Sequence, residues 1–208
     1  MSSKLSKQVL ESADITAIIQ LILRERESRD LGRWDTMRAC FWPDSVVRVS
    51  WFRGNGPDFV SGSIDMAERG VAAKHRLGPI LVRLNQERAV ASLTGTIDLP
   101  VELAGVQATL STHARFLYRA ERRTAEWRLF GFDVVYSRDE LTPAIPGETI
   151  AIDPSEVKEF RSSYRMLGYH LKTLGFSIDS GLAGEDRPDL IEALNEELFA
   201  WAGLPIPS

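Results

Sequence analysis

The chain has 208 residues, of which 44% are hydrophobic and 26% are charged, the composition of a globular domain rather than of a disordered or fibrous chain. Its 29 acidic and 25 basic residues give a formal net charge of −4, which favours neither a nucleic-acid partner nor binding to an anionic membrane. The apolar runs are too short to cross a bilayer, and early acidic residues interrupt any secretory segment, so we expect a cytoplasmic protein. At this length folding hides roughly 70% of the surface of the unfolded chain, enough to enclose a ligand cavity.

The first predicted elements are two helices. A helix over residues 15 to about 31 is indicated by apolar side chains at the spacing i, i+3, i+4 and i+7, namely Ile15, Ile18, Ile19 and Ile22. Asp14 stands where its N-cap is expected, and Gly32 where it is expected to end. A short second helix follows, up to the turn at Pro43.

A strand and a third helix come next. Apolar and polar residues alternate from Val47 to Phe52, the period of a strand, until Gly54–Pro57 ends it. The third helix is predicted from one continuous stripe at helical spacing, formed by Ile64, Ala67, Val71 and His75, with Gly78 and Pro79 closing the segment.

The remaining chain divides into strands and then helices. From Pro79 to about Tyr136 the runs are rich in Val, Thr, Phe and Tyr and are separated by short turns, which predicts long antiparallel strands. Residues 142–152 resemble a linker, Asp153 and Pro154 begin a helix that runs through Leu171, and a second helix follows Pro188. The predicted fold class is therefore α+β, a cone-shaped curved antiparallel sheet over residues 1–140 packed on N-terminal helices. Residues 141–208 form a linker and a C-terminal helical pair that covers the same domain or a partner subunit.

Asp30 and His75 are the strongest candidates for chemistry. The buried stripe of the first helix continues from Ile22 to charged residues, Arg26, Arg29 and Asp30, and an inward carboxylate is costly unless a partner satisfies it. His75 ends the stripe of the third helix, and a histidine paired with a carboxylate is a minimal general base. The alternative is structural: Asp30 turns to solvent at a frayed helix end, and His75 stabilises a helix terminus.

A second group of polar residues lies on the predicted sheet. Ser111, His113 and Arg115 share one face of a long strand, which either faces solvent or lines a polar pocket where Arg115 holds an anionic oxygen. Asp133 on the last strand is a weaker candidate for the same cavity. The three histidines lack a zinc-binding pattern and Cys40 is the only cysteine, so we expect neither a metal nor a cofactor.

Four short motifs carry a resemblance to a known family: residues 29–35 (RDLGRWD), 41–47 (FWPDSVV), 74–75 (KH) and 127–129 (WRL). With the order of elements, residues 10–140 resemble the SnoaL-like polyketide cyclase and dehydratase branch of the nuclear transport factor 2-like superfamily, which includes scytalone dehydratase. The resemblance implies that Asp30 pairs with His75 as a general base for dehydration or elimination. Scytalone dehydratase also uses two pocket tyrosines and a second histidine, whereas the matching positions here are Arg29, Trp51 and a strand without histidine, so a different substrate is implied.

Two functions follow from these residues. The first is a cofactor-independent lyase or isomerase acting on a small carbonyl-bearing or polyketide-like molecule, with Asp30 and His75 as the base and Arg115, His113, Trp51 and Asp133 around the substrate. The second is a non-catalytic ligand-binding or protein-association module, whose pocket is filled by side chains such as Trp51 and Phe132. Under both we expect a homodimer that associates through an open sheet face, with no nucleic acid and no membrane as partner.

Overall fold

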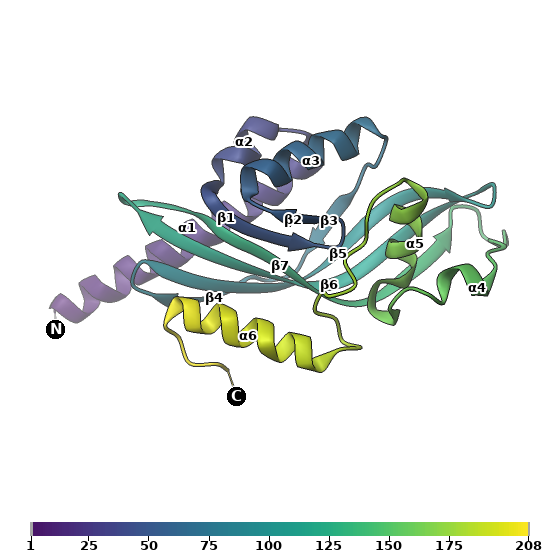
Figure 1. The fold of residues 1–208 in the computed structure, drawn as a ribbon. Helices are drawn as coiled ribbons and strands as arrows, with labels where there is room; N and C mark the ends of the chain where they lie inside the picture. Colours follow the sequence, from purple (N-terminus) through teal and green to yellow (C-terminus); the bar gives the residue numbers. More distant parts are fainter. Residues whose placement is uncertain (1, 208) are drawn as a thin grey trace.

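The fold is built around a curved sheet of seven strands (Figure 1). The computed structural model describes the backbone of residues 2–207 and the side chains of residues 7–207. Three long strands form the centre of the sheet, β5 (Arg88–Leu103), β6 (Val106–Arg123) and β7 (Glu126–Pro143). Four shorter strands complete it, β1 (Phe41–Val49), β2 (Phe52–Gly54), β3 (Lys74–Leu77) and β4 (Leu81–Asn85).

The strand order is β2-β1-β7-β6-β5-β3, and β4 also pairs with β5. The β1–β7 pair is parallel and the other pairs are antiparallel, so the sheet is mixed and mostly antiparallel. The predicted α+β class and the long curved strands are confirmed. The prediction of a purely antiparallel sheet is wrong, because β1 and β7 are parallel.

Helices cover both faces of this sheet (Figure 1). The inner face is covered by α1 (Ser2–Leu31), α2 (Trp34–Ala39), α3 (Gly56–Glu68) and, further along, α5 (Arg165–Thr173). The outer face is covered by α6 (Pro188–Ala202). Two short elements precede α5, the helix α4 (Pro154–Val157) and a 3₁₀ turn at Ser162–Tyr164.

Side chains of the central strands alternate between two apolar layers. On β6, Phe116 and Tyr118 face inward and join the main core beneath α1 and α3, whereas Leu117 faces outward. The outward layer includes Leu198 and Phe199 of α6, which are 0% and 4% exposed. Burying each such side chain contributes roughly 1.5–3 kcal/mol, so α6 is an integral part of the fold.

The prediction that His75 ends the third helix is wrong. The helix ends at Glu68, and Gly70, with a φ of 83°, turns the chain. Only glycine adopts that backbone conformation without strain, so the helical stripe through Val71 to His75 is a coincidence of spacing. His75 instead lies on β3, where it pairs with Ile97 of β5.

Three other helix boundaries also differ from the prediction. The second helix ends at Ala39 rather than at a turn at Pro43, because residues from Phe41 on pair with β7 as strand β1. The first helix begins at Ser2, and Asp14 is not its cap: its carboxylate accepts hydrogen bonds from Arg122 Nη1 at 2.7 Å and Trp127 Nε1 at 2.9 Å. Asp153 does cap a helix, accepting from Ser155 N–H at 2.8 Å, but that helix ends at Val157 and a new one begins at Arg165. Gly32, with a φ of 68°, ends the first helix as predicted.

Within residues 2–207, no helix is both long and apolar enough to span a membrane. Over the same residues, no three His, Cys, Asp or Glu side chains are grouped to hold a metal ion. Cys40 is buried, as predicted for a small hydrophobic side chain, and burial raises the pKa of its thiol to about 12.

Candidate active site

Two separate elements bring Asp30 and His75 together. Asp30 lies in the last turn of α1, and His75 lies on the edge strand β3. His75 Nδ1 is 2.5 Å from Asp30 Oδ1, and the backbone N–H of His75 donates to Asp30 Oδ2 at 2.8 Å. Both carboxylate oxygens are thus used by one residue. The side chain of Asp30 is 17% exposed and that of His75 is 6% exposed, so the pair is largely removed from water.

The neighbours of His75 determine which ring nitrogen carries the proton. Asp30 accepts hydrogen bonds, so Nδ1 carries the proton, while Nε2 lies 3.4 Å from Nη1 of Arg26. A guanidinium has donors only, so Nε2 is unprotonated and presents its lone pair. The ring also packs edge-on against Phe116 with centroids 6.1 Å apart, which holds it in this orientation.

Burial and two arginines keep this imidazole neutral. Burial lowers the pKa of His75 and the positive charges of Arg26 and Arg29 lower it further, while Asp30 opposes them without reversing the sign. The pKa of Asp30 is also lowered: burial alone would raise it, but the hydrogen bonds from His75 outweigh that effect. The resting pair at neutral pH is therefore a carboxylate and a neutral imidazole.

His75 lines an internal cavity between the sheet and the helices. The cavity has a volume of about 50 Å³, room for about two water molecules. Its wall is mostly apolar and aromatic, with Trp51, Phe59, Phe116 and Phe132 among the side chains that form it. Leu167 and Leu171 of α5 close one side, so a ligand larger than a few non-hydrogen atoms requires α5 or the neighbouring side chains to move.

A surface groove lies on the other side of the dyad. It is bordered by α1 and β3, has a volume of about 770 Å³, and shares only Arg26 and His75 with the internal cavity. Asp30 lines the groove but not the cavity. The dyad therefore stands between the mostly apolar cavity and the surface groove, where a proton taken up from the cavity can be exchanged with water.

Two buried arginines of α1 also line the cavity. Arg26 pairs with the carboxylate of its neighbour Glu25, which is 0% exposed, and its guanidinium lies 4.7 Å from the ring centroid of Phe132. Burial alone would lower the pKa of Arg26, but Glu25 raises it above its usual value. Among residues 7–207, Arg29 has no such carboxylate partner; its Nη2 is 3.5 Å from Met66 Sδ.

The other predicted site residues are divided between the two faces of the sheet. Trp51, in the turn between β1 and β2, lines the cavity as expected. His113 and Arg115 lie on the outer face, where Arg115 is exposed and His113 Nε2 is 3.4 Å from Glu140. The expectation that they share a cavity with His75 is therefore not met, because residues that alternate with Phe116 point away from it.

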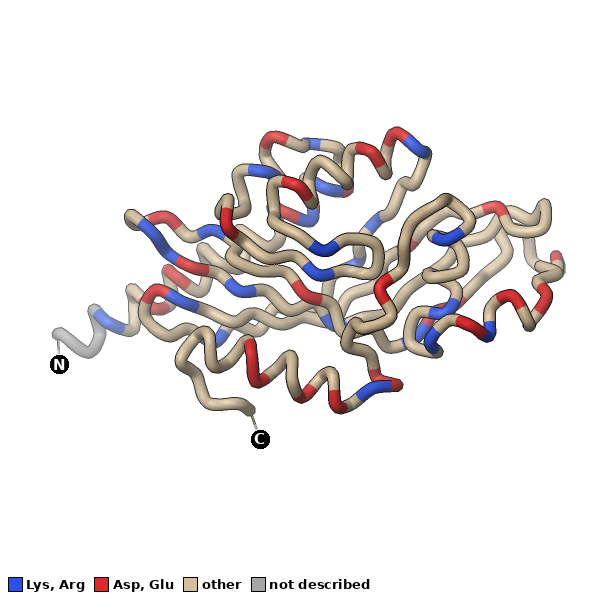
Figure 2. Tube along the Cα trace, in the orientation of Figure 1, with Lys and Arg blue, Asp and Glu red and all other residues tan. Residues whose placement is uncertain are grey.

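Asp133 also points outward, into a cluster of charges beneath α6. It pairs with Arg48 at 2.5 Å and Arg119 at 3.5 Å, and both arginines also contact Glu197 of α6. Figure 2 shows that acidic residues recur along α6, of which Glu197 is the one that reaches the sheet. Burial raises the pKa of Asp133, and the arginines oppose that shift. The cluster joins α6 to the sheet on the face opposite the cavity.

Sequence reasoning missed Glu25 as a buried residue. Counting from Ile18, Glu25 lies seven residues further on, on the inward stripe of α1, so the spacing did contain the signal. Its charge concealed its position, because a glutamate is seldom buried without a partner. That partner, Arg26, is the adjacent residue, and Tyr118 Oη lies 3.5 Å from the same carboxylate.

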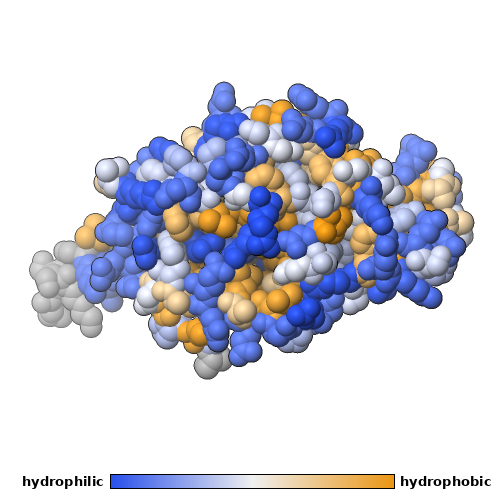
Figure 3. Space-filling model, in the orientation of Figure 1, coloured by the Kyte–Doolittle hydropathy of each residue, from blue (hydrophilic) through white to orange (hydrophobic). Residues whose placement is uncertain are grey.

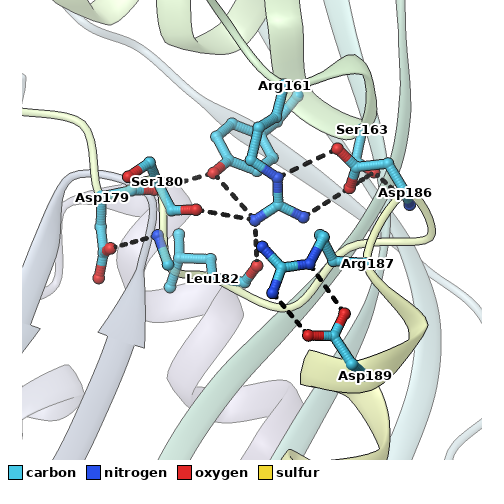
Figure 4. Close-up of polar contacts among 10 residues, drawn as sticks. Arg161, Ser163, Asp179, Ser180, Leu182, Asp186, Arg187 and Asp189 are labelled. Atoms are coloured by element: carbon cyan, nitrogen blue, oxygen red, sulfur yellow. Dashed lines mark hydrogen bonds and ion pairs between the residues drawn. The ribbon is translucent and has the colours of Figure 1, made fainter.

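Residues 161–187, which include Leu167 and Leu171 at the cavity wall, form a C-terminal segment that is held by a network around Arg161 (Figure 4). Arg161 donates to both oxygens of Asp186, at 3.0 and 2.5 Å, and to the carbonyl oxygens of Ser180 and Leu182, at 2.9 and 2.5 Å. The start of α5 is fixed separately by Asp139 of β7, which accepts from two of its backbone N–H groups, at 2.7 and 2.9 Å. Hydrogen bonds therefore join parts of this segment to one another and join its helix α5 to the sheet.

Solved structures with the same fold include enzymes. A hexachlorocyclohexane dehydrochlorinase is 14% identical with a TM-score of 0.55, over 71% of this chain and 98% of that one. A putative scytalone dehydratase from Novosphingobium aromaticivorans is 12% identical with a TM-score of 0.52, over 68% and 95%. An NTF2-like protein with a cystatin-like fold from the same species is 20% identical with a TM-score of 0.53, over 64% and 87%. At these identities the likeness shows a shared fold.

Sequence comparison adds one curated relative and a family. An uncharacterised protein of Aspergillus terreus is 24% identical over 177 residues, which are 76% of this chain and 65% of the relative. This chain therefore spans about two thirds of the length of that relative. Residues 10–133, more than half of the chain, match the SnoaL-like domain. The protein belongs to the SnoaL-like domain family and has its NTF2-like fold.

Proposed function

We propose that the protein is a cofactor-independent lyase or isomerase of the dehydratase or cyclase type, with Asp30 and His75 as its general base. The single observation that carries this proposal is the buried pair itself: a carboxylate 2.5 Å from Nδ1, and Nε2 free of a proton at the wall of an apolar cavity. Two structural neighbours named as a dehydrochlorinase and a putative dehydratase support the reaction class.

The proposed chemistry begins with proton abstraction from carbon. His75 Nε2 takes a proton from a carbon next to a carbonyl group, and the bonding electrons move to the carbonyl oxygen to give an enolate. Asp30 stabilises the imidazolium that forms, and the guanidinium groups at the cavity wall stabilise the oxyanion. The enolate then either expels a leaving group from the adjacent carbon, which receives the proton from His75, or takes the proton back at another carbon. The first outcome is an elimination and the second an isomerisation.

Replacement of His75 tests this role. We expect His75→Ala to lower turnover of a small β-hydroxy ketone by about 10²–10⁴-fold, the usual contribution of a general base. The absorbance of the conjugated enone product measures the rate over a panel of cyclic and open-chain β-hydroxy ketones. His113→Ala is the matched control, because that histidine lies on the outer face of the sheet. A panel substrate turned over equally fast by wild type and His75→Ala contradicts the proposal.

A non-catalytic module is the second candidate, and the small size of the cavity favours it. Trp51 and Phe132 line the cavity, whose free volume is about 50 Å³. A titration of the histidine ring signals by NMR separates the two functions. A functional dyad requires that the His75 pKa fall further in Asp30→Asn, because the hydrogen bond and the negative charge that raise it are removed. A His75 pKa that is the same in both proteins supports the module.

A further inference from the structure

Arg29 is a buried cation that faces the cavity and has no carboxylate partner among the described residues. It is 6% exposed, and no acidic oxygen lies within 4 Å of its guanidinium. The contacts it does make are weak: Nη2 approaches Met66 Sδ at 3.5 Å, and the guanidinium lies 5.6 Å from the ring centroid of Trp34. Five N–H donors thus face one poor acceptor and an aromatic ring.

Arg26, about one turn earlier on the same helix, is a buried arginine that does have a carboxylate partner. Arg26 is 3% exposed, forms a two-pronged contact with Glu25, and lies over Phe132. Its charge is already balanced, so it does not require an anion from outside. For Arg29, burial and the positive charge of Arg26 lower the pKa to about 10, although the charges of Asp30 and Glu25 oppose them, so it remains a cation at neutral pH with no carboxylate of the described residues in contact.

We propose that Arg29 is the anion-binding residue of the cavity and that the substrate is a small carboxylic acid, held with its carboxylate on Arg29 and an acidic C–H bond toward His75. This inference rests on the proposed function for the role of His75, but not for the existence of the anion site. Arginine binds a carboxylate through two parallel hydrogen bonds, which fixes its orientation as well as its position.

The shape of the cavity limits the size of this acid. As it stands the cavity holds only a few non-hydrogen atoms, so a carboxylate with a short branched chain or a single ring requires the side chains of Leu167 and Leu171 of α5 to move aside. The rest of the wall is apolar, so the substrate has one charged end and a hydrocarbon body. The proton that His75 removes then lies next to a separate carbonyl group of the acid, as in the proposed reaction, while Arg29 holds the charged end of the molecule.

Binding measurements test the anion site without knowledge of the reaction. The probes are isobutyrate and cyclohexanecarboxylate, each compared with its neutral amide of the same shape, titrated calorimetrically into the full chain in low-chloride buffer. We expect wild type to bind each acid at least about tenfold more tightly than its amide, because a charge-assisted contact replaces a neutral one. In Arg29→Met this preference should disappear, and in Arg29→Lys part of it should remain. Arg33→Met, at an exposed position of the same segment, should keep the wild-type preference.

The outcomes distinguish this inference from the proposed function. Acids that bind wild type no better than their amides overturn it, and so does an unchanged preference in Arg29→Met, or binding of chloride with equal strength. The first comparison needs no variant, so it holds even if Arg29→Met does not fold. His75→Ala should still prefer the acids. If it does, and His75 nevertheless proves dispensable for turnover, the anion site stands and the catalytic proposal fails. If wild type shows no preference for acids but requires His75 for turnover, only the anion site is contradicted.

Discussion

His75 combines two properties of a buried base: an unprotonated Nε2, which Arg26 Nη1 approaches at 3.4 Å, and a fixed orientation. Asp30 fixes the ring through Nδ1, while the backbone N–H of His75, on an edge strand, donates to the other oxygen of the same carboxylate. An edge strand has backbone groups that no neighbouring strand uses, and here one of them positions a side chain. The dyad therefore depends on the backbone of β3 as well as on the ring.

The lowered pKa of His75 makes stability depend on pH in a defined direction. Its folded pKa lies below the ordinary value of 6.5, so at pH values just below 6.5 the unfolded chain binds more protons than the folded one. The stability contributed by the neutral ring is complete above pH 6.5 and is lost as the pH falls below that value. Each unit of pKa shift corresponds to about 1.4 kcal/mol.

We therefore predict that the free energy of unfolding of wild type, relative to His75→Gln, decreases between pH 7.5 and 5. Urea denaturation at several pH values measures this difference. His170, whose pKa burial also lowers, titrates in both proteins and cancels in the difference. A difference that stays constant over this range contradicts a lowered His75 pKa.

At the scale of elements, the sequence correctly predicted helices that have one apolar face, but it did not separate helix from strand in short segments. Ile18 and Ile22 correctly placed the buried face of α1, and Pro188 correctly placed the start of α6. The strand β3 has four residues, too few to show a period of two, and its sequence continues the helical spacing of α3 by chance. His75 was thus identified on the wrong element, although its proximity to Asp30 was correctly anticipated.

The outer-face residues illustrate a different limit. A polar strand face has the same pattern whether it meets solvent or lines a pocket, and only the curvature of the sheet decides between them. The polar face that carries His113 and Arg115 is the outer one, whereas Arg26 and Arg29, which continue the apolar stripe of α1, are inside. Charged residues on an otherwise apolar stripe were the more reliable indication of the cavity.

Arg161 holds the C-terminal segment over the cavity, and its removal should loosen that segment. In Arg161→Ala, Asp186 loses its cation, and the carbonyls of Ser180 and Leu182 lose a donor, which we expect to cost about 1–3 kcal/mol. Hydrogen exchange should accelerate in α5 and residues 179–187, while α1 keeps its protection.

Arg187→Ala is the matched control for this prediction. Arg187 also pairs with an aspartate, Asp189, in the same region (Figure 4), but the two side chains are 49% and 60% exposed. An exposed pair contributes little, so exchange in α5 should match that of wild type. Equal acceleration in both variants would show that Arg161 does not hold the segment in the way its contacts indicate.

At the scale of the whole molecule, the sheet serves two purposes on its two faces. The inner face and its helices enclose the dyad, and the outer face is covered in part by α6 (Figure 1). This helix buries Leu198 and lies over the charges around Asp133. On the side shown in Figure 3, hydrophobic residues form separate groups between hydrophilic ones. An open outer face was the surface through which we expected a homodimer to form, and α6 covers part of that surface.

We predict that displacing α6 increases self-association. Leu198 is 0% exposed, so Leu198→Asp places an unpaired carboxylate in the apolar layer against Leu117 and Val135, which should release α6 and expose that layer. Size-exclusion chromatography with light scattering should show a larger average mass than for wild type. Ala200→Asp introduces the same charge at an exposed position of the same helix and should leave the mass unchanged. If Leu198→Asp also keeps the wild-type mass while α6 exchanges its amide hydrogens freely, the outer face does not associate, and the protein does not dimerise through it.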